Sequence, residues 1–348
     1  MTIVTRRTIV QAWLGARLSR ANDLASPYLT RYKIGRLVLT ASGKSSDFDS
    51  RSVDCPFLFA HDGLFYMTYV GFDGAGYQTG LASSRDLVTW RRLGCILKRN
   101  PDSPTTRYNV AMNWIVRENS LRSRGSLKKI HGRFLGVYHA YPNAGYESGP
   151  AVIGLCWSND LFHWSLDEPC LRPEQGAAWE RGGLYKPCLV EHEGTFYLFY
   201  NAKTSEPRGW REQTGVAVTT DLKTFRRYQR NPILPNGGPG SPDERFASDP
   251  CVLRDGRKWV MFYYGLDAKG KARDLLAVGD DAYSFRKSGM ILVDVGGAGT
   301  VDETYAHKPG IVWNDGALYH FYCAVSGRYP NEIRGISVAR SVPWPNQK

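Results

Sequence analysis

The sequence lacks the cysteine pattern of a disulfide-stapled or zinc-binding protein. Its seven cysteines are odd in number and widely spaced, and no two of them form a Cys-x-x-Cys pair. This pattern disfavours both a disulfide framework and a structural zinc site. We therefore expect reduced thiols that are mostly buried as small apolar side chains, and no metal or cofactor is predicted.

Long apolar runs are also missing. No stretch reaches the roughly 18 consecutive apolar residues that a membrane-spanning helix needs, so no membrane partner is expected. Residues 1–20 are basic, but Gln11 and Arg17 interrupt their apolar run, which makes them a poor signal peptide. The sequence therefore predicts a soluble protein with a cytoplasmic location.

Charged residues are scarce, at 22% of the chain, whereas residues that favour turns and strands are plentiful. The chain has 36 Gly, 19 Pro, 10 Trp, 20 Tyr and 14 Phe. This composition predicts an all-β protein with many short strands, and it excludes a coiled coil, a helix bundle and a disordered chain. The formal net charge of +12 attracts nucleic acid, acidic glycans or phosphate, and does not choose among them.

One pattern of three strands recurs along the chain. An apolar strand opened by proline is followed by an aromatic strand, and then by a strand that ends in an Asp-containing turn and an aromatic residue. The first element recurs at 54–59, 185–190, 248–253 and 307–312, and in degenerate form at 111–116, where Asn113 replaces the proline. Five units of about 60 residues predict a five-bladed β-propeller. A β-sandwich, the alternative, has no reason to repeat one pattern five times.

The two ends of the chain are expected to meet in the last blade. The fifth copy ends without an outer strand, whereas an unassigned strand at 35–40 precedes the first copy. We therefore expect the N-terminal strand to complete the last blade and leave no open sheet edge. In this division residues 1–42 supply a short helix, over 8–20, and the closing strand, while residues 43–348 form the propeller domain.

Loops on opposite faces of such a propeller would carry different side chains. The basic segment 117–133 falls on the bottom face and is expected to be a solvated, mobile loop, with a partner-docking patch as the alternative. No aromatic residue is interleaved there, so no nucleic-acid partner is expected. Tyr, Trp, Glu, Asp, Arg and His gather instead on the top face, in segments 71–79, 139–150, 201–213, 265–274 and 326–334 and in linkers 177–183, 241–247 and 302–308. Such side chains fit a carbohydrate cleft.

Over roughly residues 50–345 the chain resembles the five-bladed propeller glycosidases, the group that contains glycoside hydrolase families 32, 43, 62, 68, 117 and 130. The resemblance rests on Asp54-Cys55-Pro56, on Ser248-Asp249-Pro250 and on the strands that end at Trp90 and Trp164. It implies that Asp54 and Asp249 match two inner-strand aspartates of those enzymes, with a one-residue difference in register relative to the proline. The first-strand Glu of the families is absent, because Lys186 and Lys308 occupy its place.

The resemblance implies an exo-acting, inverting glycoside hydrolase. Glu180 and Glu244, in two linkers across the ring from Asp54, are the nearest acidic substitutes for the missing Glu. Asp54 would be the general base, Glu180 or Glu244 the general acid, and Asp249 the group that modulates the acid. Each glutamate stands beside an arginine, so ordinary surface ion pairs are the alternative.

An oligosaccharide or glycoside is the expected substrate partner. Candidate substrate-binding residues are Tyr77, Asn113, His139, Trp179, Lys186, Trp210, Arg245, His307 and Lys308. Two other functions remain open. The cationic side chains among these residues are compatible with a glycoside phosphorylase, in which phosphate replaces water, and the missing first-strand Glu is compatible with a non-catalytic sugar-binding propeller.

Overall fold

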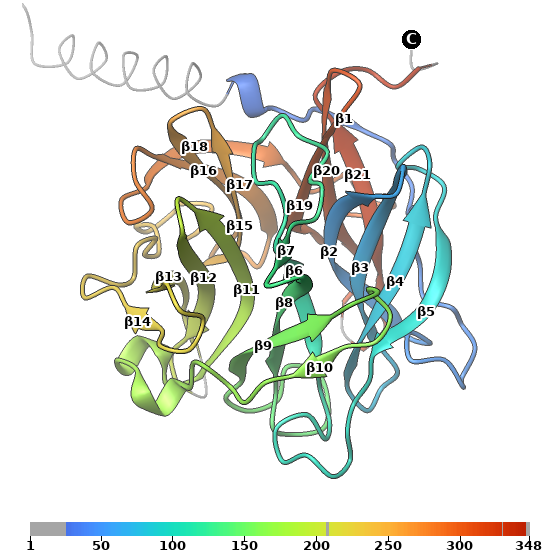
Figure 1. Cartoon of the computed structure of the whole chain (residues 1–348). Coiled ribbons are helices and arrows are strands. Elements are labelled where there is room, and N and C mark those ends of the chain that lie inside the picture. The colour runs from blue at the N-terminus through green and yellow to red at the C-terminus, as the bar shows by residue number, and fades with distance from the viewer. Residues whose placement is uncertain (1–25, 207–208, 329, 346–348) are drawn as a thin grey trace, which may run out of the picture.

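The computed structural model describes residues 26–206, 209–328 and 330–345, and this part of the chain is nearly all β (Figure 1). Its helical elements are the short 3-10 turns η1 (Ser26–Tyr28), η2 (Pro173–Gln175) and η3 (Ala178–Glu180). The helix expected over residues 8–20 lies outside the described residues. Within the described ranges, no helix has the length and apolar character needed to cross a membrane.

The strands follow one another as antiparallel meanders in chain order. The first meander consists of β2 (Ser52–His61), β3 (Leu64–Phe72), β4 (Tyr77–Ser84) and β5 (Arg91–Leu97). The second consists of β6 (Ala111–Ile115), β7 (Lys129–Ile130), β8 (Arg133–Ala140), β9 (Val152–Ser158) and β10 (Ser165–Leu166). In it, β8 lies between β6 and β9.

The later meanders are joined by short parallel bridges, from β13 to β15 and from β17 to β19. The third is β11 (Gly183–His192), β12 (Thr195–Lys203), β13 (Glu212–Thr219) and β14 (Arg226–Arg227). The fourth is β15 (Phe246–Asp255), β16 (Lys258–Leu266), β17 (Ala272–Gly279) and β18 (Arg286–Val293). The next is β19 (Tyr305–Asn314), β20 (Ala317–Ser326) and β21 (Ile333–Arg340).

The N-terminal segment pairs with the last strand. Strand β1 (Tyr32–Lys33) runs antiparallel to β21, and Leu39 forms a further bridge with Ile336. The first strands of the meanders also contact one another in sequence, β2 with β6, β6 with β11, β11 with β15 and β15 with β19, and β19 returns to contact β2. The first strands therefore surround a common axis.

A bulge interrupts each proline-opened first strand at the same place. The residue before the proline has a positive φ of 52° at Cys55, 49° at Lys186, 53° at Asp249 and 66° at Lys308. The pairing register shifts across each of these positions. Left-handed backbone in residues other than glycine is costly and concentrates at functional sites. Because Asp249 is the counterpart of Cys55, the register difference between Asp54 and Asp249 is real.

The basic segment 117–133 is an ordered cover across one end of the axis, so its expected character as a solvated, mobile loop is wrong. Its backbone exchanges hydrogen bonds with Ala60, Arg254 and Trp313, which belong to three different meanders. The buried Arg117 guanidinium donates to the carbonyl oxygens of Leu58 and Ile311, the latter at 2.9 Å. These hydrogen bonds hold the segment in place, because a buried carbonyl oxygen without a donor would be costly.

Candidate functional site

A cavity of about 740 Å³ opens at the end of the axis opposite to the Arg117 cover. Its wall combines carboxylates with cations, namely Glu147 and Glu212 with Lys203, Lys308 and Arg334. Glu147 lies in the loop after β8, Lys203 and Glu212 lie at facing ends of β12 and β13, Lys308 lies on β19 and Arg334 on β21. The meanders thus deliver residues from distant parts of the sequence to one concave surface.

One side of this cavity is a continuous row of rings. Trp210 stacks on Phe246 at 5.9 Å between centroids, with 28° between the planes, and Phe246 meets Tyr264 edge-on at 6.4 Å. His307 lies 5.1 Å from Tyr264 and 5.3 Å from Tyr305. All five rings line the cavity, and Trp210 at its rim is 37% exposed. We call these five residues the aromatic wall.

A second, narrow cavity of about 40 Å³ lies on the axis beneath the first and shares Lys308 with it. Asn113 and the bulge residues Cys55, Lys186, Asp249 and Lys308 line it. Lys186 Nζ lies 2.7 Å from Cys55 Sγ. Burial raises the pKa of the Cys55 thiol to about 12, so this thiol remains protonated at neutral pH.

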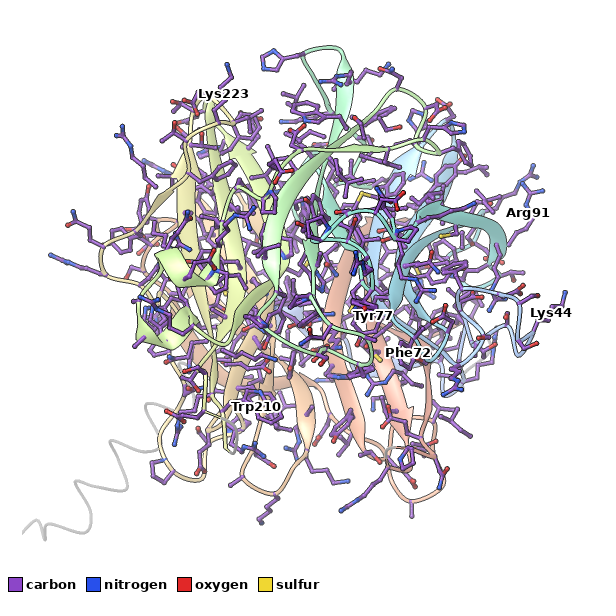
Figure 2. The ribbon with its side chains drawn as sticks, turned by 90° about the horizontal axis from the view of Figure 1, so that it is seen from below. Lys44, Phe72, Tyr77, Arg91, Trp210 and Lys223 are labelled. Atoms are coloured by element: carbon purple, nitrogen blue, oxygen red, sulfur yellow. The ribbon has the colours of Figure 1, made fainter. Side chains whose placement is uncertain are left out.

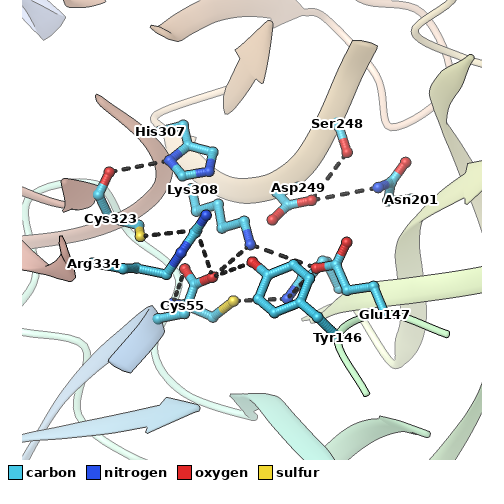
Figure 3. Close-up of polar contacts among 12 residues, drawn as sticks. Cys55, Tyr146, Glu147, Asn201, Ser248, Asp249, His307, Lys308, Cys323 and Arg334 are labelled. Atoms are coloured by element: carbon cyan, nitrogen blue, oxygen red, sulfur yellow. Dashed lines mark hydrogen bonds and ion pairs between the residues drawn. The ribbon is translucent and has the colours of Figure 1, made fainter. Parts of the chain in front are cut away.

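Asp54 is held by two cations at the junction of the first and last meanders (Figure 3). Its Oδ2 accepts from Lys308 Nζ at 2.7 Å, from Arg334 Nη1 at 3.1 Å and from the Tyr146 hydroxyl at 3.3 Å. Burial alone would raise the pKa of this carboxyl, but Lys308 and Arg334 hold it well below its usual range. Asp54 is therefore an ionised carboxylate, 3% exposed, behind side chains that line the large cavity.

Glu212 and Asp249 form a carboxyl pair on the side of the axis opposite to Asp54. Ser248 Oγ lies 2.9 Å from Glu212 Oε2 and 3.0 Å from Asp249 Oδ1. Asn201 Nδ2 donates to the same two oxygens, at 3.0 and 3.4 Å. Burial raises the pKa of Asp249 to about 7; Glu212 and Glu147 push it upward and Lys186 and Lys308 oppose them. The pair therefore holds a proton near neutral pH.

Glu147 is a second carboxylate on the cavity wall that lies close to the axial lysines, and its side chain is 24% exposed. Its Oε1 lies 3.7 Å from Lys308 Nζ and 3.9 Å from Lys186 Nζ. Burial would raise its pKa, but Lys308, Lys186 and Lys203 lower it below the usual value. Glu147 is thus ionised and partly open to the cavity.

A buried group of rings lies close to this site. His139 is 5.5 Å from Tyr141 and 6.3 Å from Tyr185, and Tyr77 is 6.2 Å from Tyr141. The hydroxyls of the three tyrosines and both ring nitrogens of His139 have no hydrogen-bond partner among the described residues. Burial, with Lys186 and Lys308 adding to it, lowers the pKa of His139, which is therefore neutral. Buried polar atoms of this kind are normally bonded to ordered water.

The candidate substrate-binding residues lie in different parts of the structure. Trp210, His307 and Lys308 line the large cavity, whereas Asn113 and Lys186 line the narrow one. Tyr77 and His139 lie in the buried group of rings. Trp179 stacks on Tyr200 at 6.2 Å, and Arg245 lies over the Phe246 ring at 5.4 Å; neither lines the large or the narrow cavity.

Neither linker glutamate expected as the acid lines the large or the narrow cavity. Glu180 is 1% exposed and bonded to Tyr200, to Arg227 at 3.0 Å and to the Ala177 N–H at 3.1 Å, away from the lining of either cavity. Glu244 accepts the Gly240 N–H at 2.7 Å within its own linker. Their carboxylates serve local turns instead.

The sequence did not single out Glu147 and Glu212, although both lie in segments expected on the top face, 139–150 and 201–213. Tyr146, Lys203 and Arg334 belong to the same segments or to 326–334. The enrichment of these loops in aromatic and charged residues was the sequence signal for the site. Which side chain faces the cavity depends on packing between meanders, which spacing along the chain does not encode.

The ring of sheets and the carboxylates on its axial cavity define the class of β-propeller glycosidases. Residues 126–301, about half of the chain, match the family model described as the glycosyl hydrolases family 32 N-terminal domain, and the chain belongs to this family. This confirms the group of families named from the sequence.

Individual relatives agree with this membership. A 1,2-beta-oligomannan phosphorylase of Thermoanaerobacter sp. (strain X514) is 26% identical over 48% of this chain and 48% of its own length. A levanbiose-producing levanase of Geobacillus stearothermophilus is 33% identical over 37% of this chain and 33% of the levanase. A solved structure described as a glycoside hydrolase has 26% identity and a TM-score of 0.80, and the match covers 94% of this chain and 96% of that protein. The chain thus spans about half or less of the two curated relatives.

Proposed function

We propose that the meanders form the five blades of a closed propeller, with the N-terminal strand as part of the last blade. The circle of contacts among the first strands, and the pairing of β1 with β21, support this arrangement. Within the predicted division at residues 1–42 and 43–348, the described residues of the first part then form a closing segment and those of the second a propeller domain. Closure leaves a single open end to the axial cavity, because the Arg117 segment covers the other.

For this propeller we propose exo-acting glycoside hydrolysis of an oligosaccharide in the large cavity. The observation that carries this proposal is the placement of Glu147 and Glu212 on one cavity wall, with Asp249 supplying a proton-holding partner to Glu212. A pocket that narrows to about 40 Å³ on the axis suits the end of a sugar chain better than its middle. The aromatic wall supplies flat surfaces for sugar rings.

Glu212, as the general acid, protonates the oxygen of the leaving sugar. A hydroxyl carries one proton, so Ser248 can donate to only one of its two carboxyl neighbours. The proton starts on Asp249, which donates to Ser248 while Ser248 donates to Glu212. As Ser248 passes its own proton to Glu212 it takes the proton of Asp249, and Glu212 delivers the proton it receives to the leaving oxygen. Asp249 therefore supports the acid, in the modulating role expected of it, and Ser248 links the two groups.

Glu147 is the better candidate for the general base. It is ionised and 24% exposed, whereas Asp54 is occupied by Lys308 and Arg334. In this assignment Glu147 removes a proton from a water molecule as the water oxygen bonds to the anomeric carbon. The bond from that carbon to the leaving oxygen breaks, and the leaving oxygen takes the proton of Glu212. Asp54 then positions Lys308 and Arg334.

An inverting outcome is proposed for this reaction. Among the described residues, Glu147 faces Lys186 and Lys308, whereas Glu212 is bonded to a different set of side chains, namely Asn201, Trp210, Ser248 and Tyr264. Separated carboxyls leave room for water, and inverting enzymes hold them roughly 6.5–9.5 Å apart. Proton NMR during the first turnovers on a panel of aryl and oligosaccharide glycosides tests this directly: the released sugar should first appear with the opposite anomeric configuration. Retention would replace water attack by a covalent intermediate.

A glycoside phosphorylase is the second candidate. The likeness to the oligomannan phosphorylase and the cationic groups Lys186, Lys203 and Lys308 around Glu147 favour it. Turnover in phosphate-free buffer supports the hydrolase, whereas turnover that requires inorganic phosphate and yields a sugar phosphate supports the phosphorylase. Binding of oligosaccharides without either product would indicate the sugar-binding propeller.

A further inference from the structure

Two cations on the wall of the large cavity have no carboxylate of the described residues within ion-pair distance. Arg181 and Lys203 both line the cavity, and neither makes an ion pair or a side-chain hydrogen bond with any residue in the described ranges. The other lining cations are engaged, because Lys308 pairs with Asp54 and Arg334 pairs with Asp54 and Glu332. An unpaired cation on a half-enclosed wall is suited to an anionic ligand.

The segments that carry these two cations run next to each other, and Lys203 lies beside the proposed acid. The Gly182 N–H donates to the Lys203 carbonyl oxygen at 2.8 Å, which places the Arg181 segment along the end of β12. Lys203 is directly opposite Glu212 in the β12–β13 pairing, so both side chains project from the same face of the sheet. A charge bound by Lys203 would therefore belong to a sugar close to the cleaved bond.

The Lys203 ammonium is also held in position by rings. Its Nζ lies 5.5 Å from the Tyr185 ring, 5.7 Å from the Tyr141 ring and 5.9 Å from the Trp210 ring. Trp210 is in turn the exposed end of the aromatic wall and stacks on Phe246. A flat ring surface next to a positioned ammonium matches a sugar that has an apolar face and a carboxylate at its edge.

The net charge of the whole chain also favours an anionic ligand. The formal net charge is +12, and an excess of this sign raises the encounter rate with acidic polymers. Among the acidic groups that line the cavity, Glu147 faces Lys186 and Lys308 at ion-pair distance and attracts Lys203 from farther away, Glu332 pairs with Arg334, and Glu206 is exposed. Arg181 and Lys203 are left without a carboxylate at ion-pair distance among the described residues.

We propose that the cavity takes an acidic oligosaccharide, in which the carboxylate of a uronic acid residue lies between Lys203 and Arg181 and its ring lies against Trp210. The proposal rests on the proposed function and names the substrate class of that same site. A carboxylate on a sugar and free inorganic phosphate share this anion chemistry, and the experiment below separates them. A neutral chain would leave both cations without a partner in the complex.

The test compares oligosaccharides before and after removal of their charge. Mixtures released from acidic polysaccharides by partial hydrolysis are supplied as such, after reduction of their carboxyl groups to alcohols, and beside a panel of neutral oligosaccharides. Sugar release is measured in phosphate-free buffer with the full-length wild-type protein and with Lys203→Met, Lys203→Arg and Arg181→Gln. Lys223→Met is the matched control, since Lys223 is exposed and lies at the opposite end of the molecule from Trp210 (Figure 2).

The wild type should release sugar from the acidic mixture roughly 10- to 100-fold faster than from the reduced one, the range expected for one charged hydrogen bond. Lys203→Met should abolish this preference, Arg181→Gln should weaken it, and Lys203→Arg and Lys223→Met should keep it. Equal rates on the two mixtures, or a preference that survives the combined Lys203→Met and Arg181→Gln changes, would overturn the proposal.

The remaining outcomes separate this proposal from the proposed function. Release from the neutral panel alone overturns the acidic substrate and leaves the hydrolase intact. If nothing is released, the hydrolase fails, and retention of the acidic mixture on immobilised protein decides the binding claim: retention lost in Lys203→Met supports it, and no retention overturns it. Inhibition of the wild type by inorganic phosphate that Lys203→Met relieves would assign the two cations to phosphate and overturn the uronate.

Discussion

Glu212 and Asp249 share a single hydroxyl: Ser248 Oγ lies 2.9 Å from one carboxyl and 3.0 Å from the other. One hydroxyl proton cannot serve two carboxylates, so both contacts are hydrogen bonds only if one carboxyl is protonated. The raised pKa of Asp249, about 7, is the electrostatic counterpart of this geometry. The pair has the property that glycosidic cleavage requires of its acid side, a proton retained near neutral pH.

The first prediction follows from this pair and concerns pH. Asp249 carries its proton below about pH 7 and loses it above, so turnover of substrates with poor leaving groups should fall above about pH 7, by about tenfold per pH unit. Asp249→Asn removes the titrating group and should abolish or displace this alkaline limb. A kcat profile measured for wild type and variant checks this, and an unchanged limb in Asp249→Asn would assign it to another group.

The same pKa has a consequence for stability. Between its unfolded value, 3.8, and about 7, the folded state binds a proton that the unfolded state has lost, so the free energy of unfolding should fall as the pH rises through this window. Asp249→Asn should flatten that slope. Denaturant titrations at several pH values measure it, and a slope of the same size in the variant would contradict the buried, proton-holding Asp249.

The second prediction separates Asp54 from Glu147. Asp54→Asn removes the shortest ion-pair partner of the buried Lys308 and one of the two partners of Arg334, and should cost about 3–5 kcal/mol in the free energy of unfolding. Glu147→Gln should cost less stability than Asp54→Asn, because its ion pairs are longer and its side chain is partly exposed, and should lower kcat by about 10²–10⁴-fold. Asp102→Asn, in an exposed turn, is the control for the loss of one carboxylate. A fully stable Asp54→Asn with kcat lowered to the same extent would return the role of base to Asp54.

Local sequence patterns predicted the sheet units because the hydrogen bonds that form the turns between strands join residues only a few positions apart. Asp86 Oδ1 accepts the N–H groups of Val88 and Thr89, and the same bonds recur at Asp160 and Asp221. Such a turn is complete within four residues, so its sequence identifies it. The aromatic strands between the turns have the alternation and composition that make them buried strands.

The site was less accessible to sequence reasoning because its contacts cross meanders. The pairing of Lys308 with Asp54 joins residues 254 positions apart, and Glu212 meets Ser248 across 36. The left-handed bulge before each proline also shifts which side chain faces the axis, so Cys55 and Asp249 became counterparts. The linker glutamates had the right residue type, but local bonds to Tyr200 and Gly240 direct them elsewhere.

The third prediction concerns the cover at the closed end. Arg117→Met removes the donors of the Leu58 and Ile311 carbonyls and should lower the free energy of unfolding by about 1–3 kcal/mol without changing kcat. Arg122→Met, in the same segment but with a side chain 67% exposed, should change stability by no more than about 0.5 kcal/mol. Chemical denaturation measures both variants. Equal stability of the two would show that the cover does not join the meanders.

The fourth prediction concerns Trp210, which both stacks and donates. Its Nε1 donates to Glu212 Oε1 at 3.0 Å, while its ring forms the exposed end of the aromatic wall. Trp210→Ala should raise KM for oligosaccharides about tenfold, which corresponds to about 1.4 kcal/mol. It should leave KM for an aryl monosaccharide nearly unchanged. Trp210→Phe keeps a ring and should preserve KM while lowering kcat; an unchanged KM in Trp210→Ala would remove the stacking role.

The measurement that tests the central assignment most directly is the leaving-group dependence of Glu212→Gln. On oligosaccharides in phosphate-free buffer, this variant should lose about 10²–10⁴-fold in kcat, since the leaving oxygen no longer receives a proton. On a dinitrophenyl glycoside of the same sugar it should approach the wild-type rate, because that group departs without protonation. An equal loss on both substrates, or full activity on the oligosaccharide, would contradict Glu212 as the general acid.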